Sequence, residues 1–413
     1  MSACDCTPDV ADLKPYEEAV ELLLSHASPV KDIETLALHD ALGRVLAAPV
    51  KSTINVPAWD NSAMDGYAVR ATDVPAEGTR LKISQRIPAG VAPQPLEPGT
   101  AARIFTGAPV PEGADAVVMQ ELTCQEDNEV IVNTIPQPGA HIRRAGEDIR
   151  AGGEIMQPGE RLLPQHLGLA ASVGVGSLQV WRRPKVAILA SGDELLMPGE
   201  PLQPGMIYNS NIFTIAGMLR ALGCEVIDLG QVEDTLEATK QALLNAAGQS
   251  DLVIASGGVS VGEEDHVKPA VEQLGELNMW KVAIRPGKPV AFGHIGDTPF
   301  IGTPGNPVSL FVTFLLFARP FIRKLAGLHE VLPTSVQATA GFSWNKPDKR
   351  REFHRARLEK QADGSDVVSV HPSRSSAVLS STTWANGLVV LPENQTIQPG
   401  DKVQFLPFCE LLS

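Results

Sequence analysis

The sequence is poor in several residue types and patterns that are typical of particular classes of protein. It contains five cysteines among 413 residues, and aromatic residues make up 5% of the chain. Apart from Cys4 and Cys6 the cysteines lie far apart, a spacing that fits neither a disulfide framework nor a zinc site. The simplest interpretation is a protein of a reducing compartment. Cys4-Asp5-Cys6 fits an unstructured N-terminal tail, and metal binding by these residues is the alternative.

Long apolar runs and basic charge are also scarce. The longest apolar run covers residues 308–318, well short of the roughly 20 residues that a membrane-spanning helix needs, so it predicts a buried helix. The N-terminus lacks the basic and apolar segments of a secretory signal. A net charge of −14 argues against general nucleic-acid binding. We therefore expect a soluble, cytoplasmic protein with neither a membrane nor a nucleic-acid partner.

Two common enzyme signatures are missing as well. No G-x-x-x-x-G-K-[ST] stretch occurs, which excludes a P-loop NTPase, and no H-E-x-x-H stretch occurs. The nine histidines show no spacing typical of metal ligands. The chemistry of this chain must therefore be sought in its glycines, carboxylates and a few cations.

The length of the chain suggests about three domains. The pattern of apolar, polar and turn-forming residues changes along it. Residues 13–50 are predicted to be helical, whereas residues 56–148 mix turn formers with short apolar runs, which indicates a β-rich module. Residues 184–330 alternate strands with helices, which predicts a three-layer αβα domain with a mostly parallel sheet. Residues 331–413 return to the strand period and predict a small β-barrel or sandwich.

Four segments that follow predicted strands of the αβα region carry glycine, carboxylates or turn formers. In open α/β sheets ligands bind beyond the carboxyl ends of the strands, so these segments should share one rim. Glycine loops let backbone N–H groups approach an anion, and carboxylates hold hard cations such as Mg²⁺. Each acid taken alone also fits a helix N-terminus. The segments are SGDE (191–194), QVED (231–234), SGGVSVGEED (256–265) and TPGNP (303–307).

A cationic stretch, WKVAIRPGKPVAF, covers residues 280–292. Lys281 and Arg285 are four residues apart, so in one continuous strand they would share a face, and Lys288 follows at a Pro-Gly turn. In an acidic protein this arrangement predicts an anion site. The alternative is a solvated edge strand, where lysine is common.

The GVSVG stretch, residues 258–262, also matches the elbow of serine hydrolases, which follows a strand and precedes a helix. Such an enzyme needs a downstream acid and histidine. His294, His329, His354 and His371 are available, but none has a telling context. Hydrolase chemistry also leaves the acids at the rim unexplained, so it remains the alternative.

Two dense stretches stand in the β-rich module. Asp65-Gly66 lies within DNSAMDGYAV and reads on its own as an ordinary tight turn. Arg143 and Arg144 lie within HIRRAGED and are predicted as a fork for an oxyanion.

Taken together and in order, these stretches resemble the molybdopterin molybdenumtransferase family, called MoeA in bacteria and matching the E domain of gephyrin. The resemblance covers about residues 13–410. It implies four domains in an elongated homodimer: residues 13–55 with 149–183, 56–148, 184–330, and a barrel over 331–413. The stretches are DNSAMDGYAV, TGAPVPEGADAVVMQE, IRRAGEDI, SGDEL, SGGVSVGEED, RPGKP and TPGNPVS.

The resemblance also implies a reaction. Molybdate is transferred to the dithiolene of adenylylated molybdopterin, and the adenylate is hydrolysed to AMP with the help of Mg²⁺. A separate molybdopterin adenylyltransferase would supply the substrate. The catalytic and metal-binding residues would be Asp65, Glu194, Asp234 and Asp265. The substrate-binding residues would be Thr106, Arg143, Ser191, Gly192, Ser256, Gly257, Gly258, Ser260, Gly262, Lys281, Arg285, Lys288, Pro304, Gly305 and Asn306.

In this family the second domain of one subunit lies over the third domain of the other, so the site would be shared. Two positions depart from the family: Arg285 stands where close relatives carry lysine, and EEDH (263–266) replaces EADY. A scaffold role like that of gephyrin is a further alternative. The sequence shows no fused adenylylating domain and no long linker, which favours the enzyme.

Overall fold

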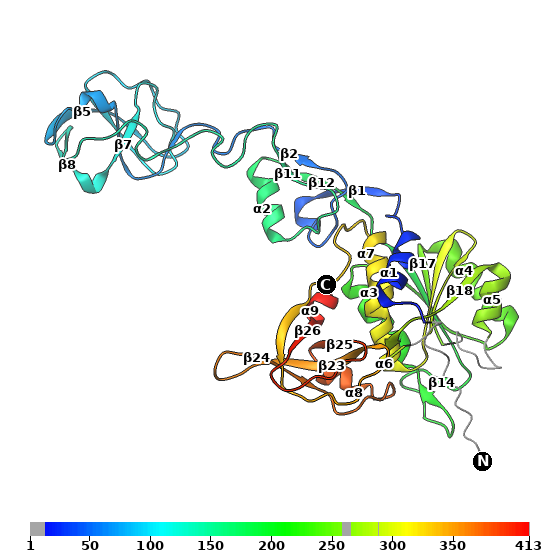
Figure 1. The fold of residues 1–413 in the computed structure, drawn as a ribbon. Coiled ribbons are helices and arrows are strands. Elements are labelled where there is room, and N and C mark those ends of the chain that lie inside the picture. The colour runs from blue at the N-terminus through cyan, green and yellow to red at the C-terminus, as the bar shows by residue number, and fades with distance from the viewer. Residues whose placement is uncertain (1–12, 258–265, 288, 413) are drawn as a thin grey trace, which may run out of the picture.

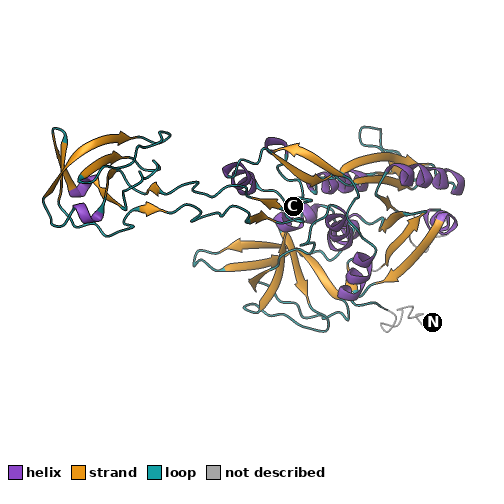
Figure 2. Ribbon diagram, turned by 90° about the horizontal axis from the view of Figure 1, so that it is seen from above, coloured by secondary structure: helices purple, strands orange, loops and turns teal. Residues whose placement is uncertain are grey.

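The computed structural model describes residues 13–257, 266–287 and 289–412. The molecule is elongated (Figures 1 and 2). A body of helices and two sheets is joined to a β-rich lobe by a narrow connection, in which the same chain runs out to the lobe and back. This shape and the mixture of layers confirm the predicted multidomain α/β fold.

The N-terminal segment contains less helix than expected. The predicted helix exists as α1 (Tyr16–Ser25), which buries Ala19, Val20 and Leu23 against the body. The prediction of helix across residues 33–50 is wrong. β1 (Ile33–Ala37) pairs antiparallel with β12 (Ser177–Trp181), a partner about 140 residues away, and this long-range pairing overrides the local helical spacing. The helix α2 (Pro164–Ser172) precedes β12 in the sequence.

The connection to the lobe is a short antiparallel ribbon formed by β2 (Val50–Lys51) and β11 (Glu154–Met156). The lobe itself, defined here as strands β3–β10, contains one sheet with the order β7-β4-β6-β5-β9-β8 and the separate pair β3–β10. Side chains of β4 alternate between two cores, with Tyr67 and Val69 in one and Ala68 in the other. The strands are β3 (Asn61–Ser62), β4 (Gly66–Val69), β5 (Thr79–Ile87), β6 (Thr100–Ile104), β7 (Ala116–Met119), β8 (Thr123–Glu126), β9 (Glu129–Val132) and β10 (Ile142–Arg143).

The predicted three-layer domain is present in the body. Its sheet has the order β16-β13-β17-β21-β20-β18, and helices cover both faces. Ile188 and its neighbours pack against α3 and α6, whereas Leu189 packs against α4 and α5. The parallel strands are β13 (Lys185–Ser191), β16 (Glu225–Val232), β17 (Leu252–Ser256) and β21 (Thr298–Thr303); β20 (Pro289–Ile295) and β18 (Gly275–Lys281) run antiparallel. The helices include α3 (Ser210–Ala221), α4 (Leu236–Gln249) and α5 (Val267–Leu274).

The apolar run 308–318 is a buried helical segment, as predicted. It begins in α6 (Pro307–Thr313), widens to a π-helical turn over Phe314–Ala318 and continues as α7 (Arg319–Leu325). All residues from Val308 to Ala318 are buried. None of the helices in the described part of the chain is both long and apolar enough to cross a membrane.

The C-terminal strands form a closed barrel and not a sandwich. Their order is β23-β24-β22-β26-β25, and a further pairing of β23 with β25 closes the ring. The short strand β19 (Ile284–Arg285) joins the start of β23 in parallel and thereby links the αβα domain to the barrel. The strands are β22 (Val336–Ala340), β23 (Arg351–Lys360), β24 (Asp366–Val370), β25 (Gly387–Leu391) and β26 (Lys402–Pro407).

Candidate functional site

The four predicted loops begin at one edge of the αβα sheet, which we call the rim. Ser256, the last residue of β17, pairs with Ala190 on β13 and with Thr303, the last residue of β21. Ser191, the last residue of β13, pairs with Val232, the last residue of β16. Because the four strands are parallel, their carboxyl ends and the loops that follow them lie together.

Polar side chains connect these loops. Ser191 Oγ donates to Asp234 Oδ1 at 2.9 Å, and Gln231 Nε2 donates to the carbonyl of Gly192 at 2.9 Å. The first loop is thereby tied to the end of β16 and to Asp234, which follows that strand. These hydrogen bonds hold the neighbouring segments of the rim in fixed positions relative to one another.

Asn211, in the first turn of α3, is a rim residue that the sequence analysis missed. Its Nδ2 donates to Ser256 Oγ at 3.0 Å and to the carbonyl of Gly305 at 2.7 Å. Within the described part of the chain its Oδ1 is buried and has no partner, which is uncommon for a buried polar atom. The signal in the sequence was weak, because an asparagine near a helix start is common for capping alone; here Asn209 is the cap.

Two glycines at the rim adopt backbone conformations that other residues rarely take. Gly257 has φ +82°, and a Cβ on it would lie 3.0 Å from the carbonyl oxygen of Ser191. Gly192 has φ +147°, and a Cβ there would lie 2.5 Å from Oε2 of Glu194. Both positions bring backbone close to neighbouring groups, as a phosphate-binding loop requires. Pro304, Gly305 and Asn306 follow β21 and lead directly into α6.

Of the four predicted acids, Glu194 and Asp234 follow rim strands in the body. Asp265 lies outside the described residues, as do Gly258, Ser260, Gly262 and Lys288. Among the residues that the structure describes, no group of three or more His, Cys, Asp or Glu side chains is placed to hold a metal ion.

The predicted cationic strand does not exist as one strand. Lys281 ends β18 of the αβα sheet, whereas Arg285 belongs to β19 and the barrel sheet. The chain leaves β18 because the residues after it pair with the N-terminal segment: Lys14 N–H donates to the Lys281 carbonyl at 2.8 Å, and Ala283 N–H donates to the Lys14 carbonyl at 2.9 Å. The two cations therefore do not share the face of a strand, and that prediction is wrong.

Arg285 also has a protein partner. It donates to Asp348 Oδ2 at 3.2 Å, and Arg350 donates to the same carboxylate. Burial raises the pKa of Asp348, but the hydrogen bonds from Arg350 and Arg285 outweigh it and hold that pKa well below its usual range. Arg285 is thus committed to an ion pair at the junction with the barrel.

Asp65 and Thr106 meet in the lobe. The backbone N–H and the hydroxyl of Thr106 both donate to Asp65 Oδ1, at 2.7 and 2.8 Å. These bonds, the backbone one first, lower the pKa of Asp65. Sequence reasoning could not foresee the contact, since Asp65-Gly66 alone reads as a turn. The contact fixes the carboxylate in its ionised form on the lobe surface.

The predicted arginine fork is not formed. Arg143, on β10, is exposed opposite Asn61. Arg144 donates to Asp60 Oδ2 at 2.5 Å and is therefore occupied by an ion pair. Asp65, Thr106 and Arg143 all lie in the lobe, far from the rim of the same chain (Figure 1).

The histidines considered for the hydrolase alternative do not form a catalytic pair at the rim. His354 is buried in the barrel, where its Nε2 contacts the carbonyl of His371, and burial lowers its pKa to about 4. His294 lies on β20 and packs against His26. The GVSVG stretch itself lies outside the described residues.

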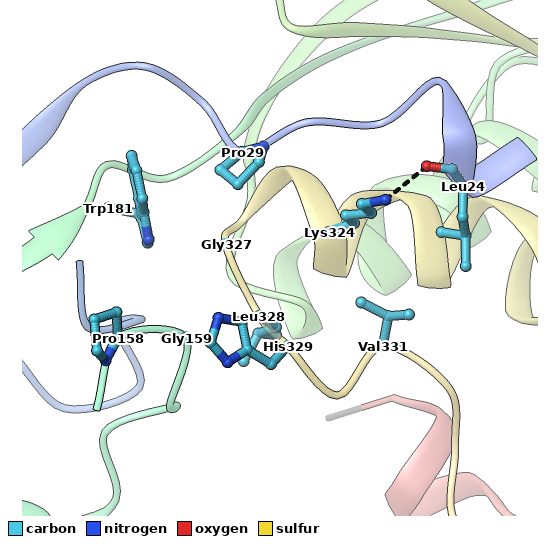
Figure 3. A pocket seen from close by; sticks show the side chains of 10 residues that line it. All are labelled: Leu24, Pro29, Pro158, Gly159, Trp181, Lys324, Gly327, Leu328, His329 and Val331. Carbon is cyan, nitrogen blue, oxygen red and sulfur yellow. Dashed lines mark hydrogen bonds between the residues drawn. The ribbon is translucent and has the colours of Figure 1, made fainter. Parts of the chain in front are cut away.

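A cavity of about 390 Å³ lies elsewhere, at the junction of α1, β12 and α7 (Figure 3). Trp181 on its wall precedes β13, so the cavity lies toward the amino ends of the strands, opposite the rim. Lys324 Nζ donates to the carbonyl of Leu24 at 2.8 Å. The other residues that line the cavity are Pro29, Pro158, Gly159, Gly327, Leu328, His329 and Val331.

Three family models match the chain in sequence order. They are the MoeA N-terminal region (domain I and II) over residues 14–174, a probable molybdopterin binding domain over residues 187–324, and the MoeA C-terminal region (domain IV) over residues 337–408. The chain belongs to the MoeA family. The predicted family and a transferase role in molybdenum cofactor biosynthesis are thereby confirmed.

Relatives and solved structures of the MoeA family resemble the whole chain. The molybdopterin molybdenumtransferase of Haemophilus influenzae is 42% identical over 92% of this chain and 95% of its own length. The one from Nostoc is 39% identical over 89% of this chain and 86% of its own length. A molybdopterin biosynthesis MoeA protein from Pyrococcus horikoshii superimposes with a TM-score of 0.81 at 32% identity, over 96% of this chain and 99% of that one. The fold prediction is confirmed by this structure.

Proposed function

We propose that this MoeA-family protein transfers molybdenum to molybdopterin, with molybdate and adenylylated molybdopterin as substrates and AMP as a product. The observation that carries the proposal is the rim, which brings together parallel strand ends, two glycines with positive φ and two carboxylates. It also holds a buried amide oxygen that has no partner among the described residues. The names of the relatives support the substrate class.

The residues of the rim would contact different parts of the substrate. The backbone at Gly192 and Gly257 approaches the anionic part of the substrate, because no side chain obstructs it. Asn211, fixed through Nδ2 to Ser256 and Gly305, presents Oδ1 to a donor of the ligand. Ser256, Pro304 and Asn306 border the same space, and Gly258, Ser260 and Gly262 belong to the adjoining loop outside the described residues.

A magnesium ion fits the donor chemistry of the rim. Glu194 and Asp234 offer hard carboxylate oxygens, and the Ser191 hydroxyl orients Asp234. When bound, such an ion would neutralise charge on the phosphates during hydrolysis of the adenylate. Since the described residues supply fewer than three clustered acids, water, the substrate, Asp265 and a second subunit would complete its ligands.

A homodimer provides that second subunit. The lobe, which carries Asp65, Thr106 and Arg143, stands at the other end of the narrow connection from the body that carries the rim (Figure 1). An arrangement in which the lobe covers the rim of another copy brings all predicted residues together. The division into residues 13–55 with 149–183, 56–148, 184–330 and 331–413, a cytoplasmic location and supply by a molybdopterin adenylyltransferase belong to the same proposal.

Lys281 and Lys288 remain the proposed molybdate-binding cations, whereas Arg285 is reassigned to the ion pair with Asp348. The test is incubation of the purified protein with adenylylated molybdopterin, molybdate and Mg²⁺. We expect AMP release that depends on molybdate and on the metal. Absence of AMP release with Mg²⁺, Mn²⁺ or Zn²⁺ would refute the proposal, and labelling of Ser260 by a fluorophosphonate would favour the hydrolase.

A further inference from the structure

Two arginines in the lobe share one aromatic platform. Arg86 on β5 and Arg103 on β6 are paired across the parallel strands. Their guanidinium carbons lie 4.6 and 4.9 Å from the ring centroid of Phe105. Arg103 also lies 5.1 Å from the ring of Tyr67, which is buried. We call Arg86 and Arg103 the arginine ledge.

No carboxylate of the described chain forms an ion pair with the ledge. Arg103 donates to neutral oxygens, the Gly66 carbonyl at 3.3 Å and Gln120 Oε1 at 2.6 Å. Arg86 is exposed and has no described hydrogen bond or ion pair. By contrast Arg80, on the same strand, pairs with Glu126 at 2.7 Å. The chain carries a net charge of −14, so a shortage of acids does not explain the difference.

Adjacent like charges on neighbouring strands destabilise a sheet. Stacking on Phe105 offsets part of that repulsion and holds the guanidinium groups in a fixed place. Among the described residues, this fixed pair of cations has no carboxylate within ion-pair distance, an arrangement that suits an external anion. Guanidinium groups match phosphate especially well, because their N–H groups form paired hydrogen bonds to its oxygens.

The ledge adjoins the functional carboxylate of the lobe. Phe105 precedes Thr106, whose hydroxyl and N–H hold Asp65. Gln120, which accepts from Arg103, also donates its backbone N–H to the Asp65 carbonyl at 3.0 Å. Both bonds from Thr106 end on Oδ1, so within the described chain Oδ2 of Asp65 has no hydrogen-bond partner. One surface thus offers two cations and an open carboxylate oxygen.

We propose that the arginine ledge binds the phosphate of the adenylate part of the substrate beside Asp65. This inference rests on the proposed function, because that function supplies the adenylate. It gives the lobe a binding role: Arg86 and Arg103 would hold the phosphate, and their positive charge would offset the repulsion between that phosphate and the ionised Asp65 nearby.

The test uses the full chain and radiolabelled AMP in equilibrium dialysis. Arg86→Gln removes the exposed cation and keeps a long polar stem, and Phe105→Leu removes the platform but leaves both cations. We expect AMP binding to weaken about tenfold in Arg86→Gln and less in Phe105→Leu. Arg80→Gln is the matched control, an exposed arginine of the same strand, and should change binding less than about twofold.

Equal affinity of Arg86→Gln and Arg80→Gln for AMP would overturn the inference, as would a wild-type chain that fails to bind AMP. The two proposals can fail separately. AMP binding that depends on Arg86 in a chain without molybdenum transfer would keep the ledge and refute the proposed function. Full transfer activity with unchanged AMP binding in Arg86→Gln would keep the function and refute the ledge.

Discussion

The rim of the body and the Asp65 surface of the lobe are two polar regions built in different ways. At the rim, parallel strand ends bring together loops that are distant in sequence, and Asn211 Oδ1 has no partner among the described residues. In the lobe, Asp65 is already held by Thr106, and the arginines rest on aromatic rings. The rim is therefore assembled from loops of four strands, whereas the Asp65 surface of the lobe is held mainly by contacts within one sheet and the loops beside it.

The largest expected effect is at the rim. Asp234→Asn should lower the rate of AMP release by at least about 100-fold, because it removes a charge from the proposed metal site. The melting temperature should stay within about 2 °C of wild type, since the residue is partly exposed. Glu225→Gln, a carboxylate at the opposite end of β16, is the control and should keep its activity. A large loss of stability in Asp234→Asn would assign the residue a structural role.

Two glycines with the same backbone angle compare the regions directly. Gly257 at the rim and Gly107 in the lobe both have φ +82°, but only Gly257 has a neighbour, the Ser191 carbonyl, within reach of a Cβ. Gly107→Ala should cost about 1 kcal/mol of unfolding free energy from backbone strain alone. Gly257→Ala should cost more, about 2 kcal/mol or above, and should abolish activity. Equal losses in urea denaturation would show that the rim is less tightly packed than the structure indicates.

Arg285→Lys tests the reassignment at the junction with the barrel. Lysine keeps the charge and can still pair with Asp348, so the dependence of AMP release on molybdate should change less than about threefold. Lys281→Gln should raise the molybdate concentration needed for half-maximal AMP release more than Arg285→Lys does. A titration of molybdate at saturating adenylylated molybdopterin measures both. If Arg285→Lys has the larger effect, Arg285 contacts the oxyanion after all.

The smallest expected effect concerns pH and the lobe. Hydrogen bonds from Thr106 lower the pKa of Asp65 in the folded protein, so the stability that they contribute is present above the unfolded pKa, about 3.9. That contribution is lost as the pH falls through the depressed folded pKa. Asp65→Asn should therefore show a slightly shallower decrease in melting temperature between about pH 5 and pH 2.5. An acid limb that is superimposable on that of wild type would mean that the bonds from Thr106 are not formed in solution.

The sequence predicted the rim better than the lobe for a physical reason. Alternating strands and helices define a parallel sheet, and a parallel sheet places the ends of its strands together. Ser191, Asp234 and Ser256 could be located by that rule. No such rule exists for the mixed sheet of the lobe, so the contacts of Asp65 with Thr106, and of Arg103 with Phe105, could not be inferred from spacing.

The errors share a cause. Residues 33–37 and 281–285 were assigned from local spacing, yet both segments are determined by partners far away in the chain. β1 pairs with β12, and the chain between β18 and β19 pairs with Lys14. Asn211 was missed because its function depends on where α3 begins relative to β17 and β21, which only the folded chain reveals.

The ribbon of β2 and β11 makes the lobe an insertion. The chain enters and leaves at adjacent positions: Ser52 N–H donates to the Gly153 carbonyl at 2.9 Å, and Gly152 N–H donates to the Ser52 carbonyl at 2.7 Å. A short turn could therefore join the two strands of the body without altering its core. Because this attachment is narrow, a small twist in the few residues of the ribbon would displace the far end of the lobe by a much larger amount. Evolution can thus exchange or re-aim the lobe through changes at its base, while the rim in the body remains unchanged.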